Sequence, residues 1–400
     1  MCNTRMRSIC SFLAFMAMAA LLAGCKTRRS FAHTSPRNDL LLISPAHRLV
    51  YQRALDGTAM LPIAGHLPWP HAMLEARLTP VNSSAPTATW QPLARADAHG
   101  RFDQRLRVPA GWYRLEVRAK SKRREANATV ERVGVGEVFI VVGHSVAHGG
   151  RTNLAGATDD RVNTIAWPAD SAEQRREYER TADPRLLPPL IGTPFTNDVR
   201  PAPFGNGTYF WARFAENIAQ RQDVPVLLLN AAFGGTSLEH WAKSARGEMF
   251  EHSFVRAGLR MPYINLHHAL RRYAAHTGVR AILADQGQND WPEPDGHKVF
   301  TNYLAFVAQA RADLGCAELA VVVNRQTSPG GKTQIRRAQE RMLRDVPHTF
   351  PGPDYDTLAK TDRYDDIHFS ASGLPRAAQL WADALTPRFF QEASPCLPTR

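Results

Sequence analysis

The chain has 400 residues, of which 44% are hydrophobic and 22% charged, with 26 Gly and 28 Pro. This composition excludes wholesale disorder, a collagen-like repeat and a polytopic membrane protein, and the length allows two or three folded units. Lys and Arg number 49 against 37 Asp and Glu, a net charge of +12 that is spread along the chain. The charge favours anionic surfaces as neighbours. It forms no basic tail, and we expect no nucleic-acid partner.

Residues 1–24 are predicted to be an export signal. Arg5 and Arg7 precede an unbroken apolar run at 12–23. The run is shorter than the roughly 20 residues that span a bilayer, but it fits the apolar section of a secretory signal peptide.

The run closes with Leu-Ala-Gly-Cys, ending at Cys25. This tetrapeptide resembles a bacterial lipobox. The resemblance implies cleavage before Cys25, attachment of lipid to its thiol and a membrane contact through that anchor. By resemblance to Gram-negative lipoproteins, Lys26 in place of Asp implies the outer membrane, facing the periplasm or the cell surface. A plain signal peptide with a chance Cys is the alternative.

Two cysteines, Cys316 and Cys396, remain in the predicted mature chain besides Cys25. An oxidising periplasm would allow them to form one disulfide. Two separate buried thiols are the equal alternative, because sequence does not give the distance between them.

The next segments are a polar basic tether at 25–37 and a small β-sandwich domain at 38–135. Residues 112–119 alternate, with Tyr113, Leu115, Val117 and Ala119 on one face and charged residues on the other. A two-residue period of this kind indicates a half-buried antiparallel strand.

From residue 136 to 395 the pattern changes to alternating strands and helices. Four runs are apolar at nearly every position, as in strands covered on both faces: 138–142, 226–229, 281–284 and 319–323. Helices are expected at 209–220, 263–276, 298–314 and 374–385, the third with an apolar stripe of Phe300, Leu304, Val307 and Ala308. This order predicts an α/β fold, a three-layer α/β/α parallel sheet of flavodoxin-like type preceded by the sandwich. The Pro-rich segment 183–203 is predicted to be a surface loop beside a site.

Polar, Gly-containing loops follow the first three of these strands, where an open parallel sheet gathers its reactive groups. They are Gly143-His144-Ser145-Val146, the loop with Gly234-Gly235-Thr236, and Gln286-Gly287-Gln288-Asn289-Asp290. An Asp365-x-x-His368 pair comes near the C-terminus. A hydroxyl, a glycine turn, an amide and an Asp/His pair are the parts that acyl transfer needs.

This set resembles the SGNH hydrolase superfamily and, within it, the sialate O-acetylesterase-like carbohydrate esterases. The resemblance implies a carbohydrate O-acetylesterase with Ser145 as nucleophile, His368 as general base and Asp365 as the carboxylate that orients it. It implies oxyanion-hole donors at Ser145, Gly235 and Asn289, with Gln286 as a further candidate. Acetylated carbohydrate would be the substrate.

Three positions depart from the narrower family: His144 replaces Gln, Val146 replaces Asn and Gln288 replaces Glu. All lie beside the site, so they bear on specificity. His144 and Trp291 are the substrate-contact candidates, and Trp241 is a second aromatic candidate whose other role would be in the core.

We expect no cofactor. We also expect no metal site at the adjacent His267 and His268, because they face different directions on a helix. The α/β-hydrolase fold is disfavoured because Ser145 follows the first parallel strand and Ala147 replaces the second Gly of Gly-x-Ser-x-Gly. One alternative function is a catalytically silent, carbohydrate-binding lipoprotein on the same fold. Another makes residues 38–135 a docking module for polysaccharide or a partner.

Overall fold

The computed structural model describes residues 40–81, 88–150, 152–327 and 331–398. The predicted signal peptide, the predicted lipidation site Cys25 and the predicted tether lie outside the described residues. Among the described residues, we find no helix with the length and hydrophobicity that a membrane span requires. Residues 38–400 form one compact unit.

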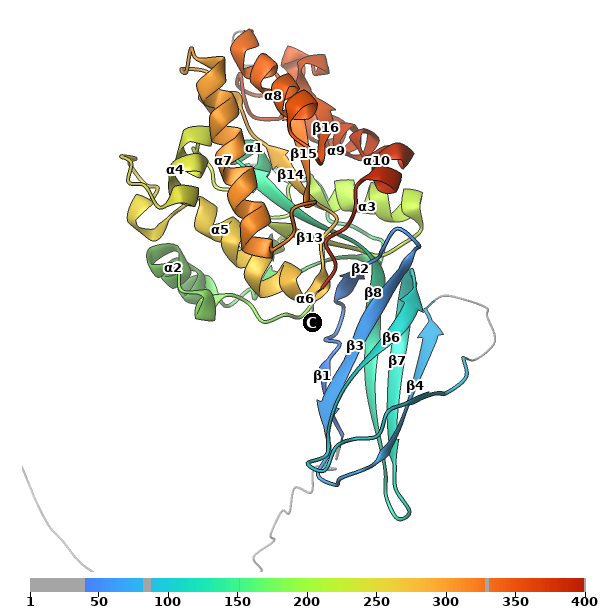
Figure 1. Cartoon of the computed structure of the whole chain (residues 1–400). Coiled ribbons are helices and arrows are strands. Elements are labelled where there is room, and N and C mark those ends of the chain that lie inside the picture. Colours follow the sequence, from blue (N-terminus) through green and yellow to red (C-terminus); the bar gives the residue numbers. More distant parts are fainter. Residues whose placement is uncertain (1–39, 82–87, 151, 328–330, 399–400) are drawn as a thin grey trace, which may run out of the picture. The chain divides into compact units, whose positions relative to one another are not determined.

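The N-terminal region is made of two small sheets (Figure 1). One has the antiparallel order β1 (Leu41–Ser44), β3 (Thr58–His66) and β6 (Arg101–Pro109). The other is formed by β2 (Val50–Gln52), β4 (Met73–Pro80), β5 (Gln91–Leu93), β7 (Gly111–Lys120) and the first half of β8 (Glu125–Gly143). The antiparallel β region predicted before the α/β part is therefore present.

Strand β7 shows how a bulge changes the predicted buried face. Leu115, Val117 and Ala119 are buried as expected, but Trp112 takes the place predicted for Tyr113, which is only half-buried. The pairs Tyr113–Val133 and Leu115–Val130 enclose a register shift, so the extra residue of the bulge lies on β8, opposite Arg114. A bulge bends the strand and increases its twist, and the alternation of buried residues changes phase across it.

The long strand β8 continues from the N-terminal region into the centre of the main sheet. The order there is β11 (Thr193–Pro194), β9 (Val162–Thr164), β13 (Val226–Asn230), β8, β14 (Ala281–Asp285), β15 (Ala320–Arg325) and β16 (Thr349–Asp354). All neighbours are parallel except β11 with β9. A short antiparallel pair, β10 (Ala166–Trp167) and β12 (Arg200–Pro201), lies apart from this sheet.

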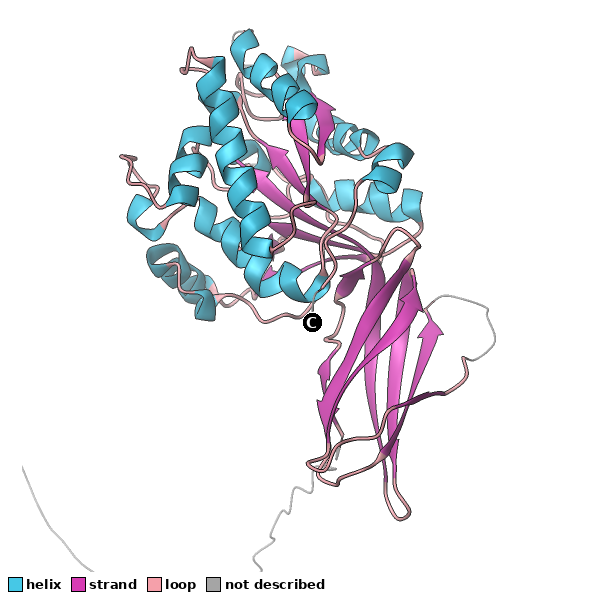
Figure 2. Ribbon diagram, in the orientation of Figure 1, coloured by secondary structure: helices cyan, strands magenta, loops and turns pink. Residues whose placement is uncertain are grey.

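Helices cover both faces of this sheet (Figure 2). They are α1 (Ser145–His148), α2 (Ala172–Thr181), α3 (Trp211–Gln222), α4 (Leu238–Arg246), α5 (Tyr263–His268), α6 (Ala275–Thr277), α7 (Gly296–Leu314), α8 (Thr333–Asp345), α9 (Gly373–Ala384) and α10 (Pro387–Glu392). On β8, Ile140 and Val142 belong to the core with α4, α5 and α7, whereas Phe139 and Val141 belong to the core with α3 and α9. The predicted three-layer α/β/α fold is confirmed.

Three local details differ from the predictions. The buried stripe of α7 includes Val299, Tyr303 and Phe306, whereas Leu304 and Ala308 are exposed. Helix 263–277 is interrupted by a π-helical turn at Ala269–Ala274. The edge strand β16 was not predicted, because its Pro-Gly-Pro sequence interrupts the apolar pattern of a central strand.

Cys316 and Cys396 form a disulfide that closes a separation of 80 residues. The sequence had left this pairing open. It ties the end of α7 to the C-terminal segment, which also pairs with Val279 through an isolated β-bridge.

Candidate active site

Ser145 lies at the point where the central strand β8 ends. Gly143 has a φ of 152°, and a Cβ there would collide with the carbonyl oxygen of Asp285 on β14. Only glycine fits this close approach. The chain then turns at His144 and enters the short helix α1, whose first residue is Ser145. Its half-buried side chain thus lies at the carboxyl edge of the sheet.

Asp365 and His368 share one short loop after β16. Asp365 Oδ1 accepts hydrogen bonds from the backbone N–H groups of Ile367 (2.8 Å) and His368 (2.6 Å). Its Oδ2 lies 2.8 Å from His368 Nδ1. The opposite ring nitrogen, Nε2, lies 2.8 Å from Ser145 Oγ. The structure therefore brings the three predicted catalytic residues into one hydrogen-bonded chain.

The carboxylate of Asp365 is partly open to solvent. Its side chain is 47% exposed. Desolvation acts to raise the pKa of Asp365, but the bonds from the backbone and ring of His368 and from Ile367 outweigh it and lower that pKa. The carboxylate therefore stays ionised and can hold the His368 ring with Nε2 toward Ser145.

The predicted oxyanion-hole residues have distinct surroundings. A Cβ placed on Gly234 would lie 3.7 Å from Ser145 Cβ, whereas one on Gly235 would meet the Phe254 ring. Gly234 therefore lies next to Ser145 in space, and the predicted donor Gly235 is the following residue in the chain. Asn289 Nδ2 donates to the carbonyl oxygen of Thr236 at 3.0 Å.

Gln286 follows Asp285, which is in register with Gly143 on the neighbouring strand. Its side chain is fully buried, and neither Oε1 nor Nε2 has a hydrogen-bond partner among the described residues. The Gln286 amide is therefore unpaired within the described part of the chain but, like the side chain of His144, has no surface open to a substrate.

The two predicted substrate contacts lie in opposite environments. His144 is fully buried, and burial together with the nearby His368 lowers its pKa to about 3. It is neutral at ordinary pH and has no exposed surface for a ligand. Trp291 is 47% exposed, whereas Trp241 is buried and donates to Thr236 Oγ1 at 3.0 Å, which makes it a core residue.

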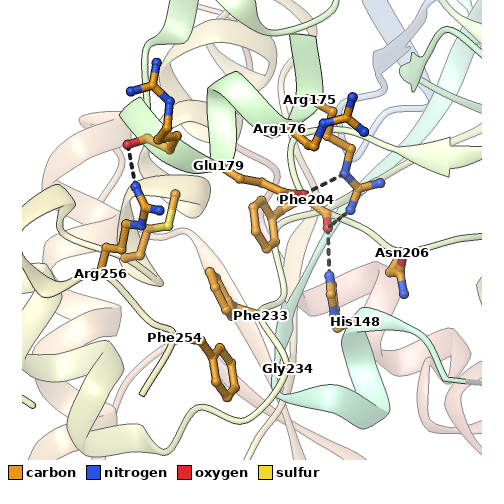
Figure 3. A pocket seen from close by; sticks show the side chains of 12 residues that line it. His148, Arg175, Arg176, Glu179, Phe204, Asn206, Phe233, Gly234, Phe254 and Arg256 are labelled. Atoms are coloured by element: carbon orange, nitrogen blue, oxygen red, sulfur yellow. Dashed lines mark hydrogen bonds and ion pairs between the residues drawn. The ribbon is translucent and has the colours of Figure 1, made fainter. Parts of the chain in front are cut away.

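A pocket of about 680 Å³ lies directly beside Gly234 (Figure 3). Phe204, Phe233 and Phe254 form one wall, with His148 against them. The other lining residues include four arginines, Arg175, Arg176, Arg180 and Arg256. Sequence analysis missed this pocket. Its only signals were the Gly pair that follows Phe233 and the Pro-rich loop that ends just before Phe204.

The described residues contain no group of three or more His, Cys, Asp or Glu side chains that could hold a metal ion. Their polar groups at the site suit acyl transfer, in which hydroxyl, imidazole and carboxylate act in series.

Residues 135–386 match the family model described as carbohydrate esterase, sialic acid-specific acetylesterase. The chain belongs to this family. It is therefore an ester hydrolase of the carbohydrate esterase type, as the resemblance predicted. None of the curated proteins compared with this esterase matches it in sequence.

Solved structures are similar to the esterase at low identity. A carbohydrate acetylesterase from Xanthomonas citri has a TM-score of 0.50 and 19% identity, covering 85% of this chain and 72% of that chain. NanS has a TM-score of 0.42 and 12% identity, and the match covers 62% of this chain and 96% of that chain. A protein from Arabidopsis thaliana has a TM-score of 0.42 and 15% identity, and the match covers 62% of this chain and 97% of that chain. The first of these likenesses shows the fold.

Proposed function

We propose that this esterase removes O-acetyl or similar short acyl groups from carbohydrate through an acyl-enzyme on Ser145. The observation that carries the proposal is the hydrogen-bonded chain from Ser145 Oγ through His368 to Asp365. Family membership supports an acetylated carbohydrate as substrate.

In the first half-reaction, His368 Nε2 takes the hydroxyl proton as Ser145 Oγ attacks the ester carbonyl carbon. The carbonyl electron pair moves onto oxygen and forms a tetrahedral oxyanion. Backbone N–H groups of Ser145 and of the Gly234-Gly235 turn, with the side-chain amide of Asn289, are the donors that we assign to it. The bond to the sugar oxygen then breaks, and His368 gives that oxygen its proton.

In the second half-reaction, His368 takes a proton from water as the water oxygen attacks the acyl carbon on Ser145. The tetrahedral intermediate collapses, the bond to Oγ breaks and His368 returns the proton to Oγ. The products are the free carboxylic acid and the regenerated hydroxyl. Throughout, the ionised Asp365 stabilises the imidazolium that forms at each step.

The test is hydrolysis of a chromogenic acetate ester by the purified full chain and by its Ser145→Ala variant. We expect the variant to lose at least about a thousandfold in kcat, as deletions of a nucleophile do. Equal activity of two folded proteins would exclude Ser145 as nucleophile. Two folded but inert proteins would instead favour the silent carbohydrate-binding lipoprotein.

We further propose that Cys25 carries lipid and anchors the esterase at the outer membrane, because the apolar run at 12–23 ends directly before the lipobox-like sequence. Expression of the full chain and of its Cys25→Ala variant tests this. The parent should fractionate with membranes and incorporate labelled fatty acid, and the variant should do neither.

A further inference from the structure

His148 has its two ring nitrogens in different situations. Nε2 lies 2.9 Å from the carbonyl oxygen of Phe204. Because a carbonyl oxygen only accepts, Nε2 must carry the hydrogen. Arg175 Nη2 donates to the same oxygen at 3.4 Å. Burial and the charge of Arg175 lower the pKa of His148 to about 4, so the ring is neutral and Nδ1 keeps its lone pair.

That lone pair faces the pocket next to the nucleophile. A Cβ placed on Gly234 would lie 3.4 Å from His148 Nδ1 and 3.7 Å from Ser145 Cβ. Both groups therefore flank the space over one glycine, and Gly234 lines the pocket together with His148. A molecule whose ester carbon is at Ser145 brings its adjoining atoms within reach of Nδ1.

The wall beside His148 is a series of nearly parallel aromatic rings. Phe204 and Phe233 have centroids 4.6 Å apart at 19°, and Phe233 and Phe254 are 6.3 Å apart at 20°. His148 lies 5.5 Å from Phe204 at 20°. Figure 3 shows the three phenyl rings following one another along the pocket, with the imidazole beside them. Flat apolar faces of this kind suit the C–H face of a sugar ring.

The polar groups of the pocket are unbalanced between donors and acceptors. Its four arginines can only donate, Glu179 is already paired with Arg175 at 3.1 Å, and Asn206 has one amide oxygen that can accept. His148 Nδ1 is therefore one of few acceptors in the pocket, and it lies beside Gly234. Such an acceptor favours a substrate that presents a hydroxyl at this point.

We propose that this pocket holds the sugar that carries the acyl group, and that His148 is a specificity-determining residue whose Nδ1 accepts a hydrogen bond from a free hydroxyl of that sugar. The inference rests on the proposed function and deepens it. It names the substrate as a partly acylated sugar ring with a free hydroxyl near the ester, in contrast to a fully substituted one.

The experiment compares two kinds of ester on the full chain. The probes are the methyl glycosides of glucose and galactose, acetylated on the primary hydroxyl, and their counterparts in which every other hydroxyl is O-methylated. The readout is the ratio of kcat/KM for the hydroxylated ester to that for the methylated ester. We expect a wild-type ratio of at least about tenfold, because the loss of one hydrogen bond worth roughly 1.4 kcal/mol lowers kcat/KM by that factor.

Two variants test the roles of the two ring nitrogens of His148 separately. In His148→Gln the side-chain amide can still donate to the Phe204 carbonyl but has no acceptor at the Nδ1 position, so the ratio should fall to about one. In His148→Asn an amide oxygen can occupy the Nδ1 position, so most of the ratio should remain. His276→Gln, an exposed histidine of α6, is the control and should keep the wild-type ratio.

A wild type that hydrolyses 4-nitrophenyl acetate but has a ratio near one for both sugars overturns the inference and leaves the proposed esterase standing. A ratio that survives in His148→Gln overturns it as well. By contrast, a wild type with no more activity than Ser145→Ala on 4-nitrophenyl acetate means that the proposed function itself has failed.

Discussion

Ser145 and His368 are 223 residues apart in the chain, yet Oγ of one and Nε2 of the other lie 2.8 Å apart. The first begins helix α1 directly after the central strand β8, and the second lies in the loop that leads into α9. Their meeting depends on the parallel sheet, which brings both segments to its carboxyl edge. The contact supplies a base to a hydroxyl that is unreactive by itself.

The carboxylate of Asp365 should matter through the ring that it holds. In Asp365→Asn, the ring loses its anionic partner, and the Nδ1–H tautomer and the imidazolium are no longer favoured. We expect kcat to fall by roughly two to four orders of magnitude, with a smaller change in KM. Steady-state kinetics on a chromogenic acetate ester measure both. The control is Asp383→Asn, a carboxylate on α9 that pairs with Arg221, which should keep the wild-type kcat.

The disulfide should stabilise the fold by restricting the unfolded chain. A cross-link that closes 80 residues corresponds to about 4 kcal/mol in the chain-entropy model. We expect Cys316→Ser with Cys396→Ser to lower the free energy of unfolding by up to that amount. Urea unfolding of the oxidised protein and the double variant gives the difference. Identical unfolding curves would contradict the expectation.

Glu137 and Arg280 form a buried ion pair where β8 enters the main sheet. Both are almost inaccessible, and Arg280 reaches both carboxylate oxygens, at 2.8 and 3.0 Å. Arg280→Met leaves the carboxylate with Arg53 as its remaining charged partner, at 2.7 Å, so we expect a loss below the roughly 3–5 kcal/mol that a fully unpaired buried charge costs. Chemical unfolding measures the loss.

The double variant Glu137→Met with Arg280→Met removes both charges and should cost less than the two single changes together. As a control, Arg388→Met breaks an exposed pair with Glu392 and should change stability by less than about 1 kcal/mol. Equal losses in the buried and exposed cases would contradict this account.

Asp290 should make stability depend on pH. Burial raises its pKa to about 8, although the backbone N–H of Leu238 partly opposes the shift. Between about pH 4, where the unfolded carboxyl ionises, and pH 8, the folded state holds a proton that the unfolded state has lost. The contribution of Asp290 to stability is therefore full below that window and falls as pH rises through it.

Asp290→Asn keeps an acceptor for Leu238 and removes this titration. Its stability relative to the wild type should rise as pH increases from 4 to 8. Urea midpoints of the two proteins across this range test the prediction. A constant difference between the two proteins at every pH would show that Asp290 has an ordinary pKa in the folded state.

The sequence by itself determined the features that depend on neighbouring residues. Runs apolar at every position, such as 138–142, predicted strands covered on both faces, because each side chain of such a strand must be buried. The residue types at Ser145, which follows a predicted strand, and at Asp365 and His368 near the C-terminus indicated acyl transfer. The family resemblance implied the contact of Asp365 with His368, and their three-residue spacing allows it.

Only the tertiary structure decided which distant groups meet. It paired Cys316 with Cys396, which lie on different elements. It placed Gly234 next to Ser145. Position along a chain does not encode such distances, because they depend on how helices and strands pack.

The pocket shows the same division between local pattern and packing. His148, Phe204 and Phe233 come from three separate segments, and none of them has a motif of its own. His144 and Trp241 were candidate ligand contacts in the sequence, but packing buries both of them in the structure. Whether a polar or aromatic residue near a site is exposed or buried depends on which side of it the neighbouring elements pack. Only the folded chain determines that side.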